Sequence, residues 1–287
     1  MAQPLLIDGM LGLGDSVYQR AFVRHFPGAY IRTAWPEVYS GLDLRFVRSG
    51  TCLRTQCKNE RQSPVRYVTP PDNARVLRIG YGPAGLSRAS IVENMRQQFG
   101  VTHPRFDLPS FSCPLPVPDD GRPLALIRPV TWRREWLNQS RSPDPQYVAQ
   151  AARILRRDFF VVSVADLADG EEWLVGECPE ADLHLHHGEL DVMQLLALTE
   201  RAAVVVGGVG WIVPAAISYG TPLYVIQGGC GAHNAPHIIT DRAMNLRRVG
   251  WAQPDRYCMC GSMTHACDKH ISHFEQNFER WLHENVL

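Results

Sequence analysis

The sequence lacks any long apolar segment. No stretch of its 287 residues comes near the roughly 18 consecutive apolar residues of a membrane span, and Met1–Ile7 has no basic side chain. A secretory signal needs a basic start followed by an extended apolar core. We therefore expect no transmembrane segment, no export signal and a cytoplasmic location.

Lysine and net charge are scarce as well. Only Lys58 and Lys269 are lysines, and the 29 basic side chains are balanced by 29 acidic ones. Residues 1–120 hold 14 basic and 10 acidic side chains, whereas residues 121–200 hold 8 and 13. The mildly positive first part permits an anionic partner without requiring one. Balanced charge and 45% hydrophobic content exclude a largely disordered chain.

Cysteine is present in a moderate number. Without an export signal, we expect the eight cysteines to be reduced thiols. Cys258, Cys260, Cys267 and His270 supply three thiols and an imidazole within 13 residues, a set that suits a structural zinc ion. The alternative is a group of free cysteines beside a surface helix, and metal analysis would decide between the two.

A proline-rich stretch divides the chain. Six prolines fall within residues 104–123, and proline neither donates to a β-ladder nor favours a helix before it, so this stretch predicts an extended linker. On both sides, short apolar runs alternate with amphipathic helices, which favours parallel sheets with crossover helices. The sequence predicts an α/β fold of two Rossmann-like domains, residues 1–118 and 119–270, followed by an amphipathic helix at 271–287.

The individual elements follow from apolar periodicity and capping residues. Strands are expected at residues 5–7, 29–33, 44–47, 76–79, 124–127, 159–164, 203–206 and 223–226. Helices are expected at 15–26, 90–99, 145–155 and 212–219, and another begins at Asp191, where Gln194 completes a capping box.

Ligands of parallel sheets bind outside the carboxyl ends of the strands, so the loops there are the candidate sites. Gly12-Leu13-Gly14-Asp15-Ser16 follows the first strand, where glycines permit close approach and a helix start supplies free amides. A carboxylate at Asp15 can take a proton from an incoming hydroxyl. The alternative is that Asp15 only caps its helix.

Three further loops belong to the second half. Arg128 to Trp136 follows the strand that opens it, and Thr131, Arg133 and Arg134 suit a diphosphate, unless they form a solvated surface run. In the next loop, Gly207, Gly208 and Gly210 offer amides to an anion and Trp211 a ring for stacking, unless the glycines serve only a tight turn. The last loop opens into the same crevice and contains Gln227, Gly228, Gly229 and His233.

In this order, the motifs resemble GT-B glycosyltransferases, most closely the heptosyltransferase-like glycosyltransferase family 9. Leu13-Gly14-Asp15 resembles the family's opening, and Arg78-Ile79-Gly80-Tyr81 resembles its run before the acceptor loop. Residues 127–136 are similar to the opening of the family's second domain, and the series from Leu195 to Pro222 matches in register. The resemblance covers most of the chain.

The resemblance implies two domains facing a cleft, the first binding the acceptor and the second a nucleotide sugar. It implies an inverting transfer with Asp15 as general base, acceptor-side positions at Gly14, Ser16, Arg78 and Tyr81, and no required cofactor. The absence of an Asp-x-Asp motif agrees with metal independence. One departure concerns Val209 to Pro214, which replace the family's acidic residue and histidine. The family's ADP-heptose is therefore not carried over as the donor.

Three alternatives remain from the sequence. Gly80 to Gly85 matches the GxGxxG pattern of dinucleotide-binding flavoproteins, although their other motifs are missing. The acceptor is a glycan of the lipopolysaccharide type or, as in phage DNA glycosyltransferases, a hydroxymethylated pyrimidine base. Basic side chains that would suit DNA phosphates are Arg45, Arg48, Arg54, Lys58, Arg61 and Arg66. Finally, the altered donor loop would also fit a catalytically degenerate nucleotide-binding protein.

Overall fold

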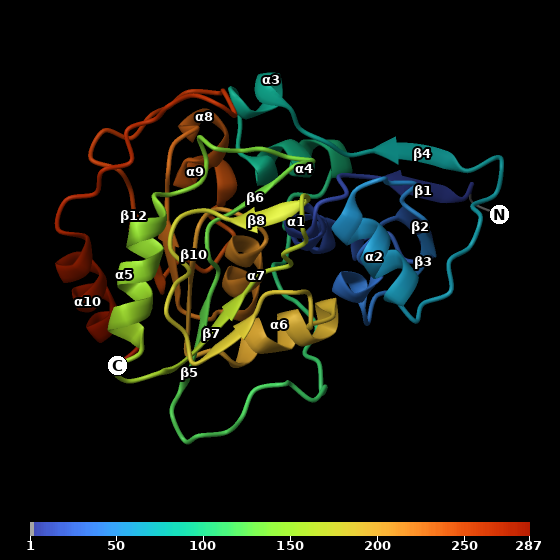
Figure 1. Ribbon diagram of the computed structural model, residues 1–287. Coiled ribbons are helices and arrows are strands. Elements are labelled where there is room, and N and C mark those ends of the chain that lie inside the picture. The colour runs from blue at the N-terminus through green and yellow to red at the C-terminus, as the bar shows by residue number, and fades with distance from the viewer. Residues whose placement is uncertain (1–2) are drawn as a thin grey trace. The chain divides into compact units, whose positions relative to one another are not determined.

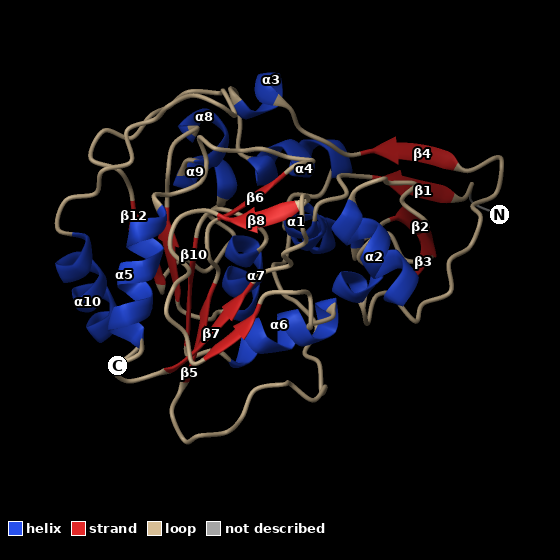
Figure 2. Cartoon of the chain, viewed as in Figure 1, coloured by secondary structure: helices blue, strands red, loops and turns tan. Residues whose placement is uncertain are grey.

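The computed structural model describes residues 3–287, which form two compact units. The first unit extends to Ser110 and also contains His237–Met244, and the second consists of Phe111–Pro236 and Asn245–Leu287. Each unit is built around a parallel sheet of its own, drawn as red arrows in Figure 2. The predicted α/β class with two parallel sheets is confirmed.

The sheet of the first unit has the strand order β3-β2-β1-β4, with all strands parallel. Its strands are β1 (Leu5–Asp8), β2 (Ala29–Arg32), β3 (Leu44–Val47) and β4 (Arg75–Arg78). Its helices are α1 (Leu13–Val23), η1 (Pro36–Tyr39), α2 (Arg54–Gln62), α3 (Pro83–Leu86) and α4 (Ile91–Phe99). Helix α1 packs on α4 through the stacked rings of Phe22 and Phe99, whose centroids are 5.2 Å apart.

Residues 237–244 belong to the first unit although they are distant in sequence. The Tyr18 hydroxyl donates to the Ile239 carbonyl at 2.6 Å, and Arg96 forms an ion pair with Asp241 at 2.9 Å. Ile239 closes the short helix α9 (Pro236–Ile239). Residues 237–244 are therefore attached to α1 and α4 by polar side chains. No local sequence pattern predicts this attachment.

The second unit contains a six-stranded parallel sheet in the order β12-β11-β10-β5-β7-β9. Its strands are β5 (Leu124–Ile127), β7 (Phe160–Val164), β9 (Leu183–Leu185), β10 (Val204–Gly207), β11 (Leu223–Ile226) and β12 (Val249–Ala252). Its helices are α5 (Pro145–Leu155), α6 (Val192–Arg201), α7 (Ile212–Tyr219), α8 (Gly231–Asn234) and α10 (Phe274–Asn285). The predicted capping box of Asp191 and Gln194 opens α6.

Helices α5 and α10 pack together over one face of this sheet (Figure 1). The predicted apolar stripe of the C-terminal helix buries Phe278 and Leu282, and the Tyr224 ring of β11 lies 4.8 Å from that of Phe278. Burial of each large apolar side chain contributes about 1.5–3 kcal/mol, so this cluster is a main source of the unit's stability. Helices α6 and α7 also pack on each other and on strands β5, β10 and β11.

Two features connect these elements. Residues 101–123, which include the proline-rich stretch, contain no helix or strand and appear as tan loop in Figure 2. After β5, a short hairpin forms that the sequence analysis did not predict: β6 (Thr131–Arg133) pairs antiparallel with β8 (Glu172–Leu174). Among the helices of residues 3–287, none has both the length and the apolar composition needed to cross a bilayer.

Candidate functional site

Asp15 stands on the first turn of α1, directly after the loop that leaves β1. Its carboxylate accepts a hydrogen bond from the Tyr81 hydroxyl. This contact is made because β1 and β4 are adjacent parallel strands, with Asp8 opposite Arg78, so that the loops at their carboxyl ends meet. The predicted base and the predicted acceptor-side tyrosine are thus brought together.

The other predicted acceptor-side residues lie around this pair in different environments. Ser16 is buried in α1 and its side chain lies at the Tyr39 hydroxyl, whereas Arg78 is exposed at the end of β4. Gly14 is part of the first turn of α1. A Cβ atom at Gly12 would come within 2.4 Å of an Asp15 carboxylate oxygen, so a larger residue there would displace the carboxylate.

Two side chains that the sequence analysis did not single out hold the β1–α1 loop. Gln19 is buried, and its amide donates to the Met10 carbonyl at 2.7 Å. The Trp35 indole N–H donates to the Leu11 carbonyl at 2.8 Å. Both bonds go to backbone oxygens, from side chains 9 and 24 residues further along the chain, and no sequence motif marks such pairings.

The GxGxxG stretch at Gly80–Gly85 leads into α3, which has only four residues. Dinucleotide-binding loops of this pattern open a long helix whose N-terminus faces the pyrophosphate. The Gly80 amide is instead occupied by the side-chain oxygen of Gln98 at 2.7 Å. The local structure therefore gives no support to the flavoprotein alternative.

In the second unit, the predicted glycine loop joins β10 to α7 at the carboxyl edge of the sheet. Gly207 and Gly210 lie against Arg128, and added Cβ atoms would come within 3.1 Å and 2.8 Å of its side chain. Gly208 lies against Pro143, and Trp211 is the N-cap residue of α7. The neighbouring loop after β11 begins at Gln227, which is buried and donates to the Asn234 carbonyl at 2.7 Å.

Thr131, Arg133 and Arg134 are positioned by the β6–β8 hairpin. The buried Glu172 carboxylate accepts from the Thr131 hydroxyl at 2.9 Å and forms an ion pair with Arg133 at 2.8 Å. Arg134 is exposed and lies 3.5 Å from Glu171. Two of the cations predicted to meet a diphosphate therefore have carboxylate partners.

A third cluster consists of Cys258, Cys260, His265 and Cys267. Their potential ligand atoms all lie within 4.8 Å of one another. The Cys260 and Cys267 sulfurs are 3.6 Å apart, and His265 Nδ1 lies 3.6 Å from the Cys258 sulfur and 3.4 Å from that of Cys267. Tetrahedral zinc with Zn–S bonds of about 2.3 Å places its ligand atoms about 3.6–3.8 Å apart. The donor set and its spacing therefore fit a four-coordinate metal ion.

The fourth member of this cluster is His265 and not His270, which corrects the sequence-based assignment. His270 Nε2 lies 3.8 Å from a carboxylate oxygen of Asp255, and the His270 carbonyl accepts from the Asp255 amide at 2.8 Å. The backbone after Cys267 turns at Asp268, whose carboxylate accepts from the His270 amide. This turn directs the His270 side chain to Asp255 and away from the thiols.

The cysteine cluster packs on the glycine loop that follows β11. A Cβ atom at Gly229 would lie 2.3 Å from the Cys267 sulfur, and the Gly231 amide donates to the Cys258 carbonyl at 2.8 Å. Ser140 is buried, and its carbonyl oxygen accepts a hydrogen bond from the Gly229 amide at 2.6 Å. The Ser140 hydroxyl donates to the His265 carbonyl. Of the remaining predicted donor residues, Gly228 lies against Ser142 and His233 beside Gly261.

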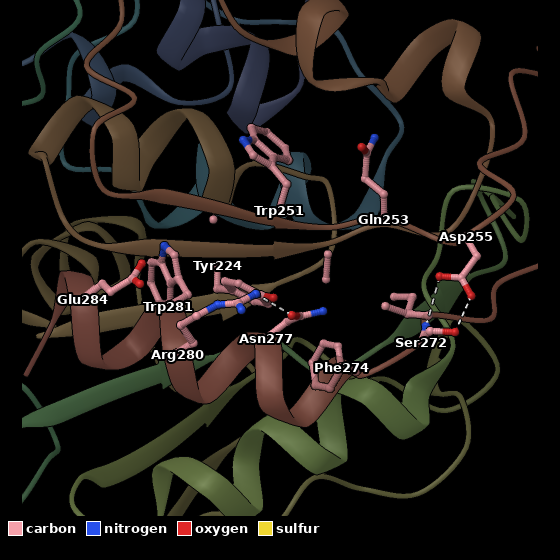
Figure 3. A pocket seen from close by; sticks show the side chains of 13 residues that line it. Tyr224, Trp251, Gln253, Asp255, Ser272, Phe274, Asn277, Arg280, Trp281 and Glu284 are labelled. Carbon is pink, nitrogen blue, oxygen red and sulfur yellow. Dashed lines mark hydrogen bonds between the residues drawn. The ribbon is translucent and has the colours of Figure 1, made fainter.

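A cavity of about 370 Å³ lies elsewhere in the second unit, between β12 and α10. Figure 3 shows Trp251 and Gln253 on one side of the strand and Tyr224 and Trp281 on the other. Several polar side chains that line the cavity form hydrogen bonds with one another; for example, the Ser272 hydroxyl donates to the Asp255 carboxylate at 2.6 Å. None of the sequence-predicted donor residues lines this cavity.

The two parallel-sheet units define the class of fold. Dodecameric iron-containing heptosyltransferase TibC, solved with ADP-D-β-D-heptose, matches over 99% of this chain and 77% of its own, with a TM-score of 0.63 and 14% identity. Escherichia coli ADP-heptose lipopolysaccharide heptosyltransferase II matches over 98% and 99%, with a TM-score of 0.54 and 11% identity. E. coli heptosyltransferase WaaC matches over 99% and 100%, with a TM-score of 0.53 and 10% identity.

The chain has the GT-B fold of the glycosyltransferase family 9 heptosyltransferases, which confirms the resemblance inferred from its motifs. A second TibC structure, from enterotoxigenic E. coli, also matches, and the match covers 57% of the length of that TibC chain. No protein-family model matches the sequence, and no curated protein matches it. The likeness thus lies in the fold.

Proposed function

We propose that the protein is an inverting, metal-independent glycosyltransferase that moves a sugar from a nucleotide-sugar donor to an acceptor hydroxyl. The observation that carries this proposal is the Asp15 carboxylate, held by the Tyr81 hydroxyl at the carboxyl end of β1 in a chain of heptosyltransferase fold. In this proposal Asp15 is the general base, and Gly14, Ser16, Arg78 and Tyr81 belong to the acceptor side.

The proposed reaction is a single displacement. The acceptor hydroxyl gives its proton to the Asp15 carboxylate while its oxygen forms a bond to the anomeric carbon. The bond from that carbon to the diphosphate breaks on the opposite face, and the nucleoside diphosphate leaves with the bonding electrons. Attack opposite to the leaving group inverts the anomeric configuration. Tyr81 keeps the carboxylate oriented for this transfer.

The donor is assigned to the carboxyl edge of the second sheet. The loops after β5, β10 and β11 meet there because these strands are neighbours. Their amides and cations would stabilise the charge that develops on the leaving diphosphate. The proposed donor-binding residues are Thr131, Arg133, Arg134, Gly207, Gly208, Gly210, Trp211, Gln227, Gly228, Gly229 and His233.

Replacement of the proposed base tests the mechanism. We expect Asp15→Asn to lower the rate of sugar transfer by about 10²-fold or more, with unchanged binding of the donor, because only proton removal is lost. Asp43→Asn, which changes an exposed carboxylate of the same unit, is the matched control. Full activity of Asp15→Asn would remove Asp15 from this role. Nucleotide binding by the wild type without turnover of any sugar donor would favour the catalytically degenerate protein.

The acceptor is proposed to be a glycan, and the DNA alternative has one specific observation in its favour. Arg45, Arg48, Arg61 and Arg66 are all exposed in the first unit. Phosphate contacts make binding fall steeply with salt concentration. Retention on duplex DNA that decreases steeply with salt would favour the hydroxymethylated-base acceptor, and no retention at low salt would favour the glycan.

We further propose that Cys258, Cys260, His265 and Cys267 hold a structural zinc ion. Three thiolates and an imidazole are a common zinc donor set. The ion would join the loop at 258–267 to the glycine loop after β11, and it takes no part in the proposed transfer. Thiolate-rich sites also accept iron, which the related TibC is described as containing.

Metal analysis of protein purified without a histidine tag tests this site. We expect about one equivalent of metal per chain in the wild type and in His270→Gln, and a loss of metal in His265→Gln. Zinc in the wild type would support the assignment, whereas iron would change the identity of the ion. A metal-free wild type, or metal lost only in His270→Gln, would contradict the proposed ligand set.

A further inference from the structure

Arg128 is the first residue after the central strand β5. Its amide continues the ladder to the neighbouring strand by donating to the Val206 carbonyl at 2.9 Å. The side chain therefore starts at the carboxyl edge of the sheet, where parallel sheets bind their ligands.

The guanidinium lies over the start of α7. Its Nη1 atom is 2.8 Å from the position that a Cβ atom would take at Gly210, so an alanine there would displace the end of the arginine side chain. The N-cap residue Trp211 makes no side-chain capping bond, and the first turn of α7 has no acidic residue. The positive end of the helix dipole and a guanidinium thus lie together with no acidic residue from the helix itself.

No hydrogen bond or ion pair engages the Arg128 guanidinium anywhere in residues 3–287, although the side chain is partly buried. Arg133 and Arg134 differ because they have Glu172 and Glu171 as partners. Burial, followed by the positive charge of Arg133, lowers the pKa of Arg128 to about 10; the Glu172 carboxylate acts in the opposite direction, and Arg141 in the same direction. A guanidinium that lies beside two further arginines, without a hydrogen-bond partner among the described residues, favours an anionic ligand.

We propose that Arg128 binds the diphosphate group of the nucleotide, together with the first amides of α7. The assignment of that diphosphate to a nucleotide sugar rests on the proposed function, whereas the anion site itself does not. A guanidinium can donate two parallel hydrogen bonds to phosphate oxygens, and helix amides add further donors. Arg128 is then the principal cation of the diphosphate site, because its guanidinium can bind phosphate oxygens without first breaking an ion pair with a carboxylate.

If Arg128 has this role, its replacement should change the thermal stability of the ligand-free protein in a characteristic direction. In the ligand-free protein, a partly buried charge that has two arginines beside it and no hydrogen-bond partner destabilises the fold, so Arg128→Gln is expected to raise the unfolding midpoint. The same change is expected to weaken the binding of inorganic pyrophosphate by about 10-fold or more, because hydrogen bonds between charged groups are lost. A residue with only a structural role would lower the midpoint on replacement.

The test uses the full chain with inorganic pyrophosphate and then with ADP, UDP, GDP and TDP, measured by calorimetry and thermal unfolding. Arg153→Gln, which removes an arginine from the exposed side of α5, is the matched control and should bind like the wild type. Arg128→Lys retains the charge and should show intermediate binding. Equal binding of pyrophosphate by wild type and Arg128→Gln, or no binding by the wild type, would overturn the proposal.

The outcomes also separate this proposal from the proposed function. Pyrophosphate binding that depends on Arg128, with no nucleotide binding and no sugar transfer, would support the anion site and contradict the glycosyltransferase. Sugar transfer and nucleotide binding that do not change in Arg128→Gln would support the glycosyltransferase and overturn the assignment of Arg128.

Discussion

Single side chains decide which charged groups of the second unit are available to a ligand. Glu172 is buried, and its carboxylate engages both Thr131 and Arg133. Adjacent arginines at the end of a strand are a reasonable prediction for a diphosphate site, but the Glu172 carboxylate, 39 residues after Arg133 in the sequence, forms an ion pair with one of them. Arg128, for which residues 3–287 provide no ion pair, is the residue that we propose to add to the donor side.

At the residue scale, His186 gives a prediction for pH dependence. His186 is buried with its Nε2 atom 2.8 Å from the Ser163 hydroxyl, and burial, followed by His184, lowers the pKa of His186 to about 4. Between the unfolded pKa near 6.5 and the folded value, the unfolded chain binds a proton that the folded chain does not. The free energy of unfolding should therefore fall as the pH drops from about 7 to about 4.

His186→Gln should reduce this loss of stability by on the order of 1–3 kcal/mol, because no imidazole remains to be protonated. Chemical denaturation at a series of pH values between 7 and 4 measures the effect. His283→Gln, which removes an exposed histidine of α10, serves as the control and should keep the wild-type pH dependence. An unchanged slope in His186→Gln would show that other groups cause the acid sensitivity.

At the scale of elements, prediction succeeded where apolar periodicity is strong. The parallel strands of the first unit, the four inner strands of the second and the C-terminal helix lie where the sequence predicted them, within a few residues at their ends. The edge strands β9 and β12 of the second sheet were not predicted. Helix α2 was missed because its only buried residues are Gln56 and Asn59, so it shows no apolar stripe. The β6–β8 hairpin was missed because its pairing depends on Glu172, which is far from Thr131 in the chain.

The contact between the glycine loop after β11 and the cysteine cluster leads to a prediction at the scale of elements. Gly229→Ala should place a methyl group 2.3 Å from the Cys267 sulfur and 2.6 Å from its Cβ atom, so that Cys267 must move. We expect destabilisation by about 1–3 kcal/mol and a lower metal content. Thermal unfolding and metal analysis check both effects.

A matched glycine substitution controls for the general effect of an added methyl group. Gly82 has no neighbouring atom within 4 Å of an added Cβ, so Gly82→Ala should leave metal content and the unfolding midpoint close to those of the wild type. If Gly229→Ala behaved in the same way, the cluster and the loop would not be coupled as we propose.

At the scale of the whole molecule, the two sheets carry separate tasks in the proposed function. A nucleoside diphosphate at 100 times its dissociation constant should stabilise the protein by about 2.7 kcal/mol. Hydrogen exchange should then show slower exchange at residues 207–212 and 227–234 of the second unit. Residues 9–15 of the first unit should exchange as before, because the proposed nucleotide site lies in the second unit alone. Slower exchange at 80–85 with NAD or FAD would instead revive the dinucleotide alternative.

The sequence by itself determined the fold class and the principal loops. Apolar runs of strand length alternating with amphipathic helices dictate parallel sheets, because crossover helices must cover both faces of each sheet. The positions of Asp15, the glycine loops and the cysteine-rich segment follow from that alternation. These are local properties, which depend on residues within one or two turns of each other.

Only the tertiary structure decided which partners the functional groups have. Four arrangements join or separate groups through space: the Tyr81 hydroxyl on Asp15, Glu172 on Arg133, His265 in place of His270, and the Arg128 guanidinium beside Gly210. Such pairings depend on strand order and on the direction in which loops turn, neither of which leaves a periodic signal in the chain. The physical reason is that the energy of a charge or a ligand atom depends on what lies within a few ångströms of it, whatever the separation in sequence.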